Sequence, residues 1–193
     1  YAGGLTMVFS DAVFLYAFFP VVFILYYLCK KIQIRNIILL VSSLVFYSWG
    51  EPRYVILMIG ASLIAYIGGL TLEYYKTNYL KKRIVFVATI LILILNLVIF
   101  KYLNFFCSNI ESLLNVEIPV KTIILPIGIS FYTFQILSYI IDLYRGEISV
   151  QKNFFYLTLY VSFFPQLIAG PIVRYQTVEY EIMNRTTSLN DVS

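Results

Sequence analysis

The run IVFVATILILILNLVIF at residues 84–100 decides the fold of this chain, because it contains no charged side chain and only two polar ones, Thr89 and Asn96. An α-helix rises about 1.5 Å per residue, so about 20 such residues cross the ~30 Å hydrocarbon core of a bilayer. The whole chain has the same character: 61% of its 193 residues are hydrophobic and 12% are charged, against about 25% charged in ordinary soluble domains. Lipid is therefore the expected solvent, and a soluble globular domain is excluded.

Five further segments are apolar enough to be interpreted as membrane spans, and they occupy residues 12–29, 36–49, 53–72, 122–141 and 154–173. With 84–100 they predict an all-α fold, a polytopic transmembrane helical bundle of about six spans. We expect one membrane domain over 1–193, in which 174–193 is a polar tail. Segment 36–49 is short for a span, so it thins the bilayer, extends into flanking residues or is shielded by its neighbours.

Proline and glycine interrupt two of these predicted spans. Backbone groups freed by such a break at membrane depth are tolerated only where protein or water can pair with them. We therefore expect broken or kinked helices, which are typical of binding sites inside membrane proteins, although a kink that serves packing alone is the alternative. The interruptions are Pro126 with Gly128 in 122–141, and Pro165, Gly170 and Pro171 in 154–173.

Lysine and arginine are concentrated in the first, third and fifth connections between the predicted spans. Because short basic loops stay on the cytoplasmic side, we expect a multi-pass protein of the cytoplasmic membrane with its N-terminus outside. The formal net charge of +4 then reflects topology and attraction to membrane lipids, and a nucleic-acid-binding face is not expected. The basic residues are Lys30, Lys31 and Arg35 in the first connection, Lys76, Lys81, Lys82 and Arg83 in the third, and Arg145 and Lys152 in the fifth.

The sequence lacks the residue patterns that a metal site, a favourable disulfide, histidine proton transfer and a glycine-rich phosphate loop require. There is no histidine, and the two cysteines, Cys29 and Cys107, fall at opposite ends of the predicted spans. This pattern supplies neither a metal-ligand spacing nor a favourable disulfide. Without histidine the usual proton shuttle near neutral pH is missing, and no glycine-rich phosphate loop is found. We expect no metal and no bound cofactor.

A stripe of polar side chains follows one face of the fifth predicted span. Tyr132, Gln135, Tyr139 and Asp142 are separated by three, four and three residues, which is the spacing of one helix face. One interpretation is hydrogen bonding between helices, with Asp142 at the level of the lipid headgroups. The other is the wall of a substrate path.

Two smaller patterns concern packing and charge. Ala61, Ala65 and Gly69 recur at every fourth position and predict a face on which another helix packs closely. Arg174 directly follows the sixth predicted span, where arginine is commonly an interfacial anchor. A fixed cation for an acidic or polar substrate is the alternative function of Arg174.

Four stretches of the sequence carry a resemblance to a known family. They are MVFSDAVFLYAFFP at 7–20, FYSWGEPRY at 46–54, LPIGISFYTFQILSYIIDLYRGE at 125–147 and SFFPQLIAGPIVRY at 162–175. Together they resemble the membrane-bound O-acyltransferase family, and in particular its alginate O-acetyltransferase-like branch. They occur in family order from Met7 onwards, and the second and fourth fit this branch better than the related D-alanyl transfer proteins of teichoic-acid modification.

The resemblance implies transfer of an acetyl group from a cytoplasmic donor such as acetyl-CoA to hydroxyls of an extracytoplasmic polysaccharide, together with a partner protein. It also implies that the catalytic histidine of the family lies beyond Ser193. The chain would then be the N-terminal portion of such an enzyme, inactive alone because the general base is absent. The motif positions expected to shape the substrate tunnel or its mouth are Gln135, Tyr139, Asp142, Arg145, Gln166, Gly170, Pro171 and Arg174.

Other functions fit the same pattern of spans. A transporter or channel subunit would also need broken helices and a polar stripe, and a non-catalytic membrane scaffold is a third interpretation. Within the acyltransferases, D-alanyl transfer to teichoic acid is the alternative reaction. The sequence leaves the acceptor open among alginate, peptidoglycan, another exopolysaccharide and teichoic-acid-type polymers.

Overall fold

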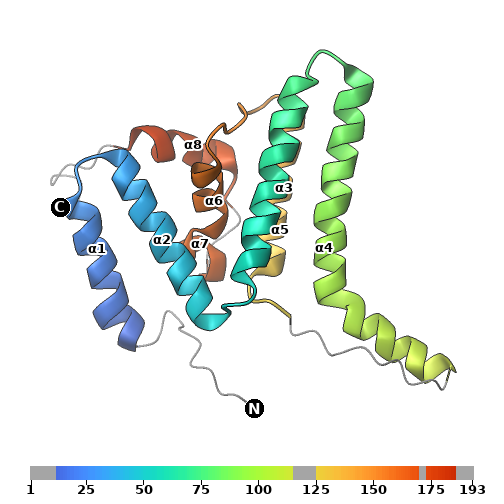
Figure 1. Cartoon of the computed structure of the whole chain (residues 1–193), viewed down its shortest axis with the longest axis horizontal. Coiled ribbons are helices and arrows are strands. Elements are labelled where there is room, and N and C mark those ends of the chain that lie inside the picture. Colours follow the sequence, from blue (N-terminus) through green and yellow to red (C-terminus); the bar gives the residue numbers. More distant parts are fainter. Residues whose placement is uncertain (1–11, 115–124, 170–172, 186–193) are drawn as a thin grey trace.

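The computed structural model describes residues 12–114, 125–169 and 173–185, and within these ranges it consists of helices and connections without any β-strand (Figure 1). The predicted all-α class is therefore confirmed. Among the described residues, a π-helical turn comes first and eight α-helices follow it in chain order. The elements are η1 Phe14–Phe18, α1 Phe19–Leu28, α2 Ile32–Gly50, α3 Val55–Tyr74, α4 Tyr79–Leu114, α5 Ile129–Arg145, α6 Phe154–Ser162, α7 Phe164–Ala169 and α8 Tyr175–Asn184.

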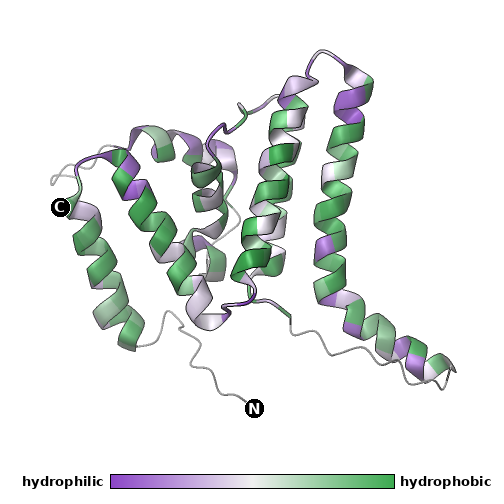
Figure 2. Cartoon of the chain, in the orientation of Figure 1, coloured by the Kyte–Doolittle hydropathy of each residue, from purple (hydrophilic) through white to green (hydrophobic). Residues whose placement is uncertain are grey.

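Three helices, α2, α3 and α4, are long and apolar enough to cross a membrane by length and composition. Figure 2 shows mostly hydrophobic residues along α1 and α4, and many large apolar side chains of these helices are exposed. Leu91 and Leu95 of α4, for example, are more than half exposed. Such a surface is stable against acyl chains and costly against water, which supports a membrane location.

Helix α3 is central to the packing, because it contacts α4, α5 and α6. Helix α2 packs against α6 on one side and α1 on the other. The connections after α1, α3 and α5 all lie on the upper side of Figure 1, and these are the three connections in which the basic residues are concentrated.

The small residues of α3 permit this close packing, as predicted. Ala61 and Ala65 are buried, and a Cβ added at Gly69 would lie 3.1 Å from the Tyr139 hydroxyl and 3.3 Å from Leu143 Cδ2 on α5. The adjacent Gly68 faces α4, where an added Cβ would lie 2.7 Å from the Thr89 side chain. Two neighbouring helices therefore approach α3 at positions where it has no side chain.

The helix boundaries differ from the expected spans at several points. Segment 36–49 is part of the 19-residue α2, so extension into the flanking residues removes its apparent shortness. Segment 84–100 is the middle of the 36-residue α4. In 122–141, Pro126 and Gly128 precede α5, which begins at Ile129. Gly128 has a left-handed backbone conformation, with φ 76°. Residues 115–124 lie outside the described ranges.

The last part of the chain also differs from expectation. Segment 154–173 divides into α6 and α7 at Phe163, two residues ahead of Pro165. The expected polar tail contains a helix, α8. The sequence did not indicate this helix, because few of its residues are apolar. This helix is anchored by the buried Tyr175 and Ile182, and the Ile182 carbonyl accepts a hydrogen bond of 2.8 Å from the Asn36 side chain of α2.

We predict that Gly69→Val lowers the stability of the protein by about 1–3 kcal/mol, because the new side chain must displace α5. Gly60→Val is the matched control on the same helix, since nothing lies within 4 Å of a Cβ added at Gly60. Thermal unfolding in detergent, followed by circular dichroism, measures both variants. Equal melting temperatures for the two variants would contradict close contact between α3 and α5 at Gly69.

Candidate functional site

The polar stripe of α5 faces the inside of the bundle. The exposed fractions of Tyr132, Gln135, Tyr139 and Asp142 are 0%, 5%, 0% and 3%. The opposite face of the same helix presents apolar side chains such as Phe131 and Phe134, each nearly half exposed. The amphipathic pattern of α5 is therefore reversed relative to a helix in water, with its polar face buried.

Gln135 pairs with the end of the broken helix α6. Its side-chain Nε2 donates a hydrogen bond of 2.8 Å to the carbonyl oxygen of Tyr160 and a longer one of 3.3 Å to Oε1 of Gln166. Tyr160 lies in the last turn of α6, where carbonyls lose their intrahelical partners. Gln135 thus caps α6 from the neighbouring helix and also reaches Gln166 on α7.

The other side of the same break is paired by α2. The backbone N–H of Phe164, the first residue of α7, donates to the hydroxyl of Ser43 at 3.3 Å, and Ser43 is fully buried. The α6–α7 break is thus held between two polar side chains from different helices, Gln135 and Ser43. We call these two residues, with Tyr160, Phe164 and Gln166, the break cluster.

The connection before α5 is paired in a similar way. Its residue Ile127 donates its N–H to the Glu51 carboxylate at 2.9 Å, and its carbonyl accepts a bond of 3.0 Å from the Tyr47 hydroxyl. Both partners belong to the end of α2 and the turn after it. Burial raises the pKa of the Glu51 carboxyl, and the bond from Ile127 acts in the opposite direction.

Three tyrosines form a second buried group next to the stripe. The Tyr175 ring meets the rings of Tyr139 and Tyr160 edge to face, with centroids 5.1 Å apart in both pairs. Gln151 joins the group, because its N–H donates to the Tyr139 hydroxyl at 3.1 Å and its Nε2 to the Tyr175 hydroxyl at 2.7 Å. The Tyr160 hydroxyl donates to the carbonyl of Val173 at 2.9 Å.

Several buried polar atoms along this interior have no hydrogen-bond partner in the structure, namely Tyr132 Oη, Ser138 Oγ, Asp142 Oδ2 and Ser162 Oγ. Asp142 is also the only acidic or basic residue among the buried polar residues of the described ranges. Unpaired buried donors and acceptors cost about 1–3 kcal/mol each, so they indicate places where a further polar group can bind.

The predicted site residues fall into three groups. Gln135 and Gln166 are in direct contact, and Tyr139 and Asp142 lie on the same buried face of α5. Arg145 and Arg174 are exposed: Arg145 lies 3.5 Å from the Glu147 carboxylate, and Arg174 precedes α8. Gly170 and Pro171 lie outside the described residues.

Five residues that contribute to this interior were not singled out from the sequence: Asn36, Ser43, Gln151, Tyr160 and Tyr175. Ser43 and Asn36 stand in an apolar helix, where a single small polar residue is common and gives no spacing to recognise. Gln151 and Tyr175 flank the expected sixth span and have the appearance of ordinary interfacial residues. Among the described residues, no three His, Cys, Asp or Glu side chains gather as metal ligands.

Comparison with known proteins gives related sequences over nearly the whole chain. The probable alginate O-acetylase AlgI of Pseudomonas syringae is 36% identical over 191 residues, which is 97% of this chain. The chain is a homologue of this O-acetylase. The protein of the same name from Pseudomonas putida is also 36% identical over 97% of this chain, and a peptidoglycan O-acetyltransferase of Helicobacter pylori is 29% identical over 88%. The resemblance inferred from the four motifs is thereby confirmed.

The chain spans 37–39% of the length of these three relatives. No family model and no solved structure matches the chain. The similarity therefore concerns a region that makes up little more than a third of each relative.

We predict that Gln135→Leu destabilises the protein by about 1–3 kcal/mol, because the Tyr160 carbonyl then loses its donor inside the bundle. Gln176→Leu, an exposed position on α8, is the matched control. Melting temperatures in detergent compare the two variants with the wild type. If Gln135→Leu were as stable as Gln176→Leu, Gln135 would not cap α6.

We predict that Glu51→Ala also lowers stability, by about 1 kcal/mol, since the Ile127 N–H loses its acceptor, whereas Glu51→Gln keeps an acceptor oxygen. Because the folded-state pKa of Glu51 is raised, the wild type loses stability as pH rises from the ordinary carboxyl pKa through the raised value. The stability of Glu51→Gln relative to wild type should therefore increase as the pH rises above the ordinary carboxyl pKa and through the raised one. A constant difference across these melts would contradict the raised pKa.

Proposed function

We propose that this chain is the N-terminal part of a membrane-bound O-acyltransferase, which transfers an acetyl group to hydroxyls of an extracytoplasmic cell-surface polysaccharide. The observation that carries the proposal is 36% identity to alginate O-acetylases over 97% of the chain. The buried polar face of α5 supports it, because a reaction inside a membrane needs hydrogen-bonding groups turned away from lipid.

The proposed donor is acetyl-CoA, bound as a substrate from the cytoplasm. The family resemblance implies a catalytic histidine, which these 193 residues do not contain, so we assign the general base to another part of the enzyme and expect the chain alone to be inactive. We assign to this chain the walls of the substrate passage, with Gln135 and Gln166 at the broken helices and Asp142 and Tyr139 along α5. Arg145 and Arg174 are exposed, which suits the mouth of such a passage.

The proposed location is the cytoplasmic membrane, crossed several times, with the N-terminus outside. The support is the shared side of the three basic connections, since basic loops remain cytoplasmic. A partner protein in the extracytoplasmic space would present the polysaccharide. The names of the relatives, which are O-acetylases and an O-acetyltransferase, favour acetyl over D-alanyl transfer.

Membrane vesicles that contain the product of the complete gene provide the test. With radiolabelled acetyl-CoA on the cytoplasmic face, we expect label on the polysaccharide. We expect less label with Arg174→Ala, at unchanged amounts of inserted protein. Arg83→Ala, an exposed arginine on α4, is the matched control and should match the wild type. Wild-type label with Arg174→Ala would count against a role at the mouth, and solute uptake without acetyl transfer would favour a transporter.

A further inference from the structure

A pocket of about 430 Å³ lies between the end of α3, the start of α4 and the connection from α5 to α6. Lys76, Lys82 and Lys152 line it together with Glu73, and Leu143 and Ile148 are part of its apolar wall. No residue of the break cluster lines this pocket. Its volume falls within the ~300–1,000 Å³ of typical small-molecule sites.

The lining of this pocket is positively charged. Three lysines face one glutamate, and Lys76 Nζ is paired with that glutamate at 2.8 Å. Glu73 also interacts electrostatically with Lys82 and Lys152, so one carboxylate faces three ammonium groups and the lining keeps an excess of positive charge. Lysine ammonium groups held around an apolar recess attract an anion, since both the Coulomb interaction and the hydrogen bonds are stronger out of bulk water.

Lys82 is held in place by the protein. Its Nζ donates a hydrogen bond of 2.8 Å to the carbonyl of Tyr144 and lies 5.0 Å from the centroid of the Tyr144 ring. An ammonium group has three donors, so two remain for a ligand. The backbone of Lys152 is fixed as well, because its carbonyl accepts a bond of 2.9 Å from the Tyr66 hydroxyl. The Lys82 ammonium group is therefore positioned by contacts that leave two of its donors available, and the backbone that carries Lys152 is fixed.

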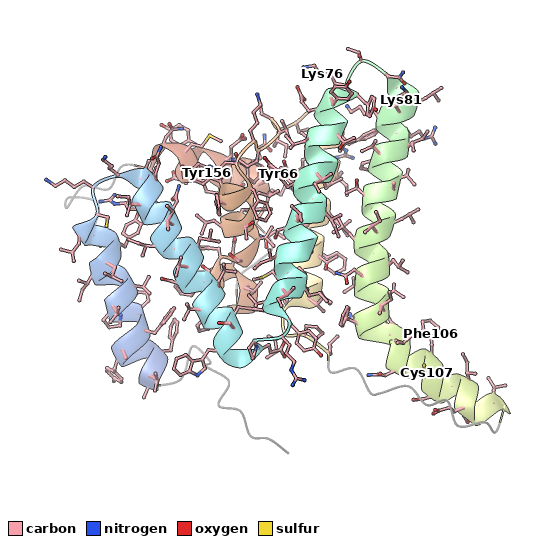
Figure 3. All side chains as sticks on the ribbon, viewed as in Figure 1. Tyr66, Lys76, Lys81, Phe106, Cys107 and Tyr156 are labelled. Carbon is pink, nitrogen blue, oxygen red and sulfur yellow. The ribbon has the colours of Figure 1, made fainter. Side chains whose placement is uncertain are left out.

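The pocket lies where the apolar helices end. Helix α3, which is long and apolar enough to cross a membrane, ends at Tyr74, and Lys76 follows two residues later. Figure 3 shows Lys76 and Lys81 at this upper end of α3 and α4, and Figure 2 shows the change there from hydrophobic to hydrophilic residues. This is the depth of lipid headgroups, where basic pockets between helices bind phosphate groups of anionic lipids.

We propose that this pocket binds a phosphate group, carried either by an anionic lipid headgroup or by a soluble phosphate ester. The site does not depend on the proposed acyl transfer. Phosphate is a compact anion with several acceptor oxygens, which suits two or three point-like ammonium groups. The apolar wall beside the lysines accommodates the uncharged part of either ligand.

Two binding measurements on the complete protein test this proposal and separate the two sources. Native mass spectrometry in detergent counts bound phosphatidylglycerol, and calorimetry in phosphatidylcholine nanodiscs measures binding of pyrophosphate. We expect binding in at least one measurement, weakened about tenfold by Lys82→Gln and by Lys152→Gln. The measurement in which the lysine variants weaken binding shows whether the phosphate comes from a lipid headgroup or from a soluble compound.

Lys81→Gln is the matched control, since Lys81 neighbours Lys82, does not line the pocket and lies 5.3 Å from the ring of Tyr75. It removes the same charge and should leave the affinity unchanged. Lys152→Gln tests the charge without disturbing the fold, because the hydrogen bond from Tyr66 goes to the backbone carbonyl of residue 152 and is kept in the variant. No binding of either probe, or equal weakening by Lys81→Gln and Lys152→Gln, would overturn the proposal.

Discussion

The rest of this structure depends on the pairing of backbone groups where helices break inside an apolar bundle. At Phe163 the chain leaves α6 and enters α7, and an unpaired N–H or carbonyl in lipid costs several kcal/mol. Gln135 of α5 supplies the donor and Ser43 of α2 the acceptor that this break needs. Because both partners come from other helices, the break is stable only in the assembled bundle.

The same pairing determines what the interior can do. The amide side chains that hold the broken helix also contact one another, as Gln135 and Gln166 do here. Hydrogen bonding between helices, one of the two interpretations of the α5 stripe, is therefore what the structure shows for Gln135, and the interpretation as the wall of a substrate path remains a proposal. The Tyr139, Tyr160 and Tyr175 rings add hydroxyl groups to the interior while keeping it mostly apolar.

The sequence predicted the features that follow from local pattern and missed those that need a tertiary partner. The run at 84–100 and the small residues of α3 were sufficient for the all-α class and the close packing, and the three-four-three spacing identified the buried face of α5. The break at Phe163 was expected near Pro165 or Gly170, because proline is the visible signal. At its actual position, the backbone on either side of the break bonds to Ser43 and Gln135. These two residues lie at least 28 residues away in the sequence and show no shared pattern.

Charge is divided between the interior and the ends in a way that follows from the cost of an ion in hydrocarbon. Lys76, Lys82 and Arg145 lie at or next to helix ends, whereas most buried polar positions hold neutral groups such as Asn36, Ser43 and Gln151. Asp142 departs from this rule, since its carboxylate is buried and its Oδ2 has no partner. It lies less than one turn from the end of α5, which is the end of that helix nearest the basic connection to α6, and an ion costs less near a helix end than at the bilayer centre.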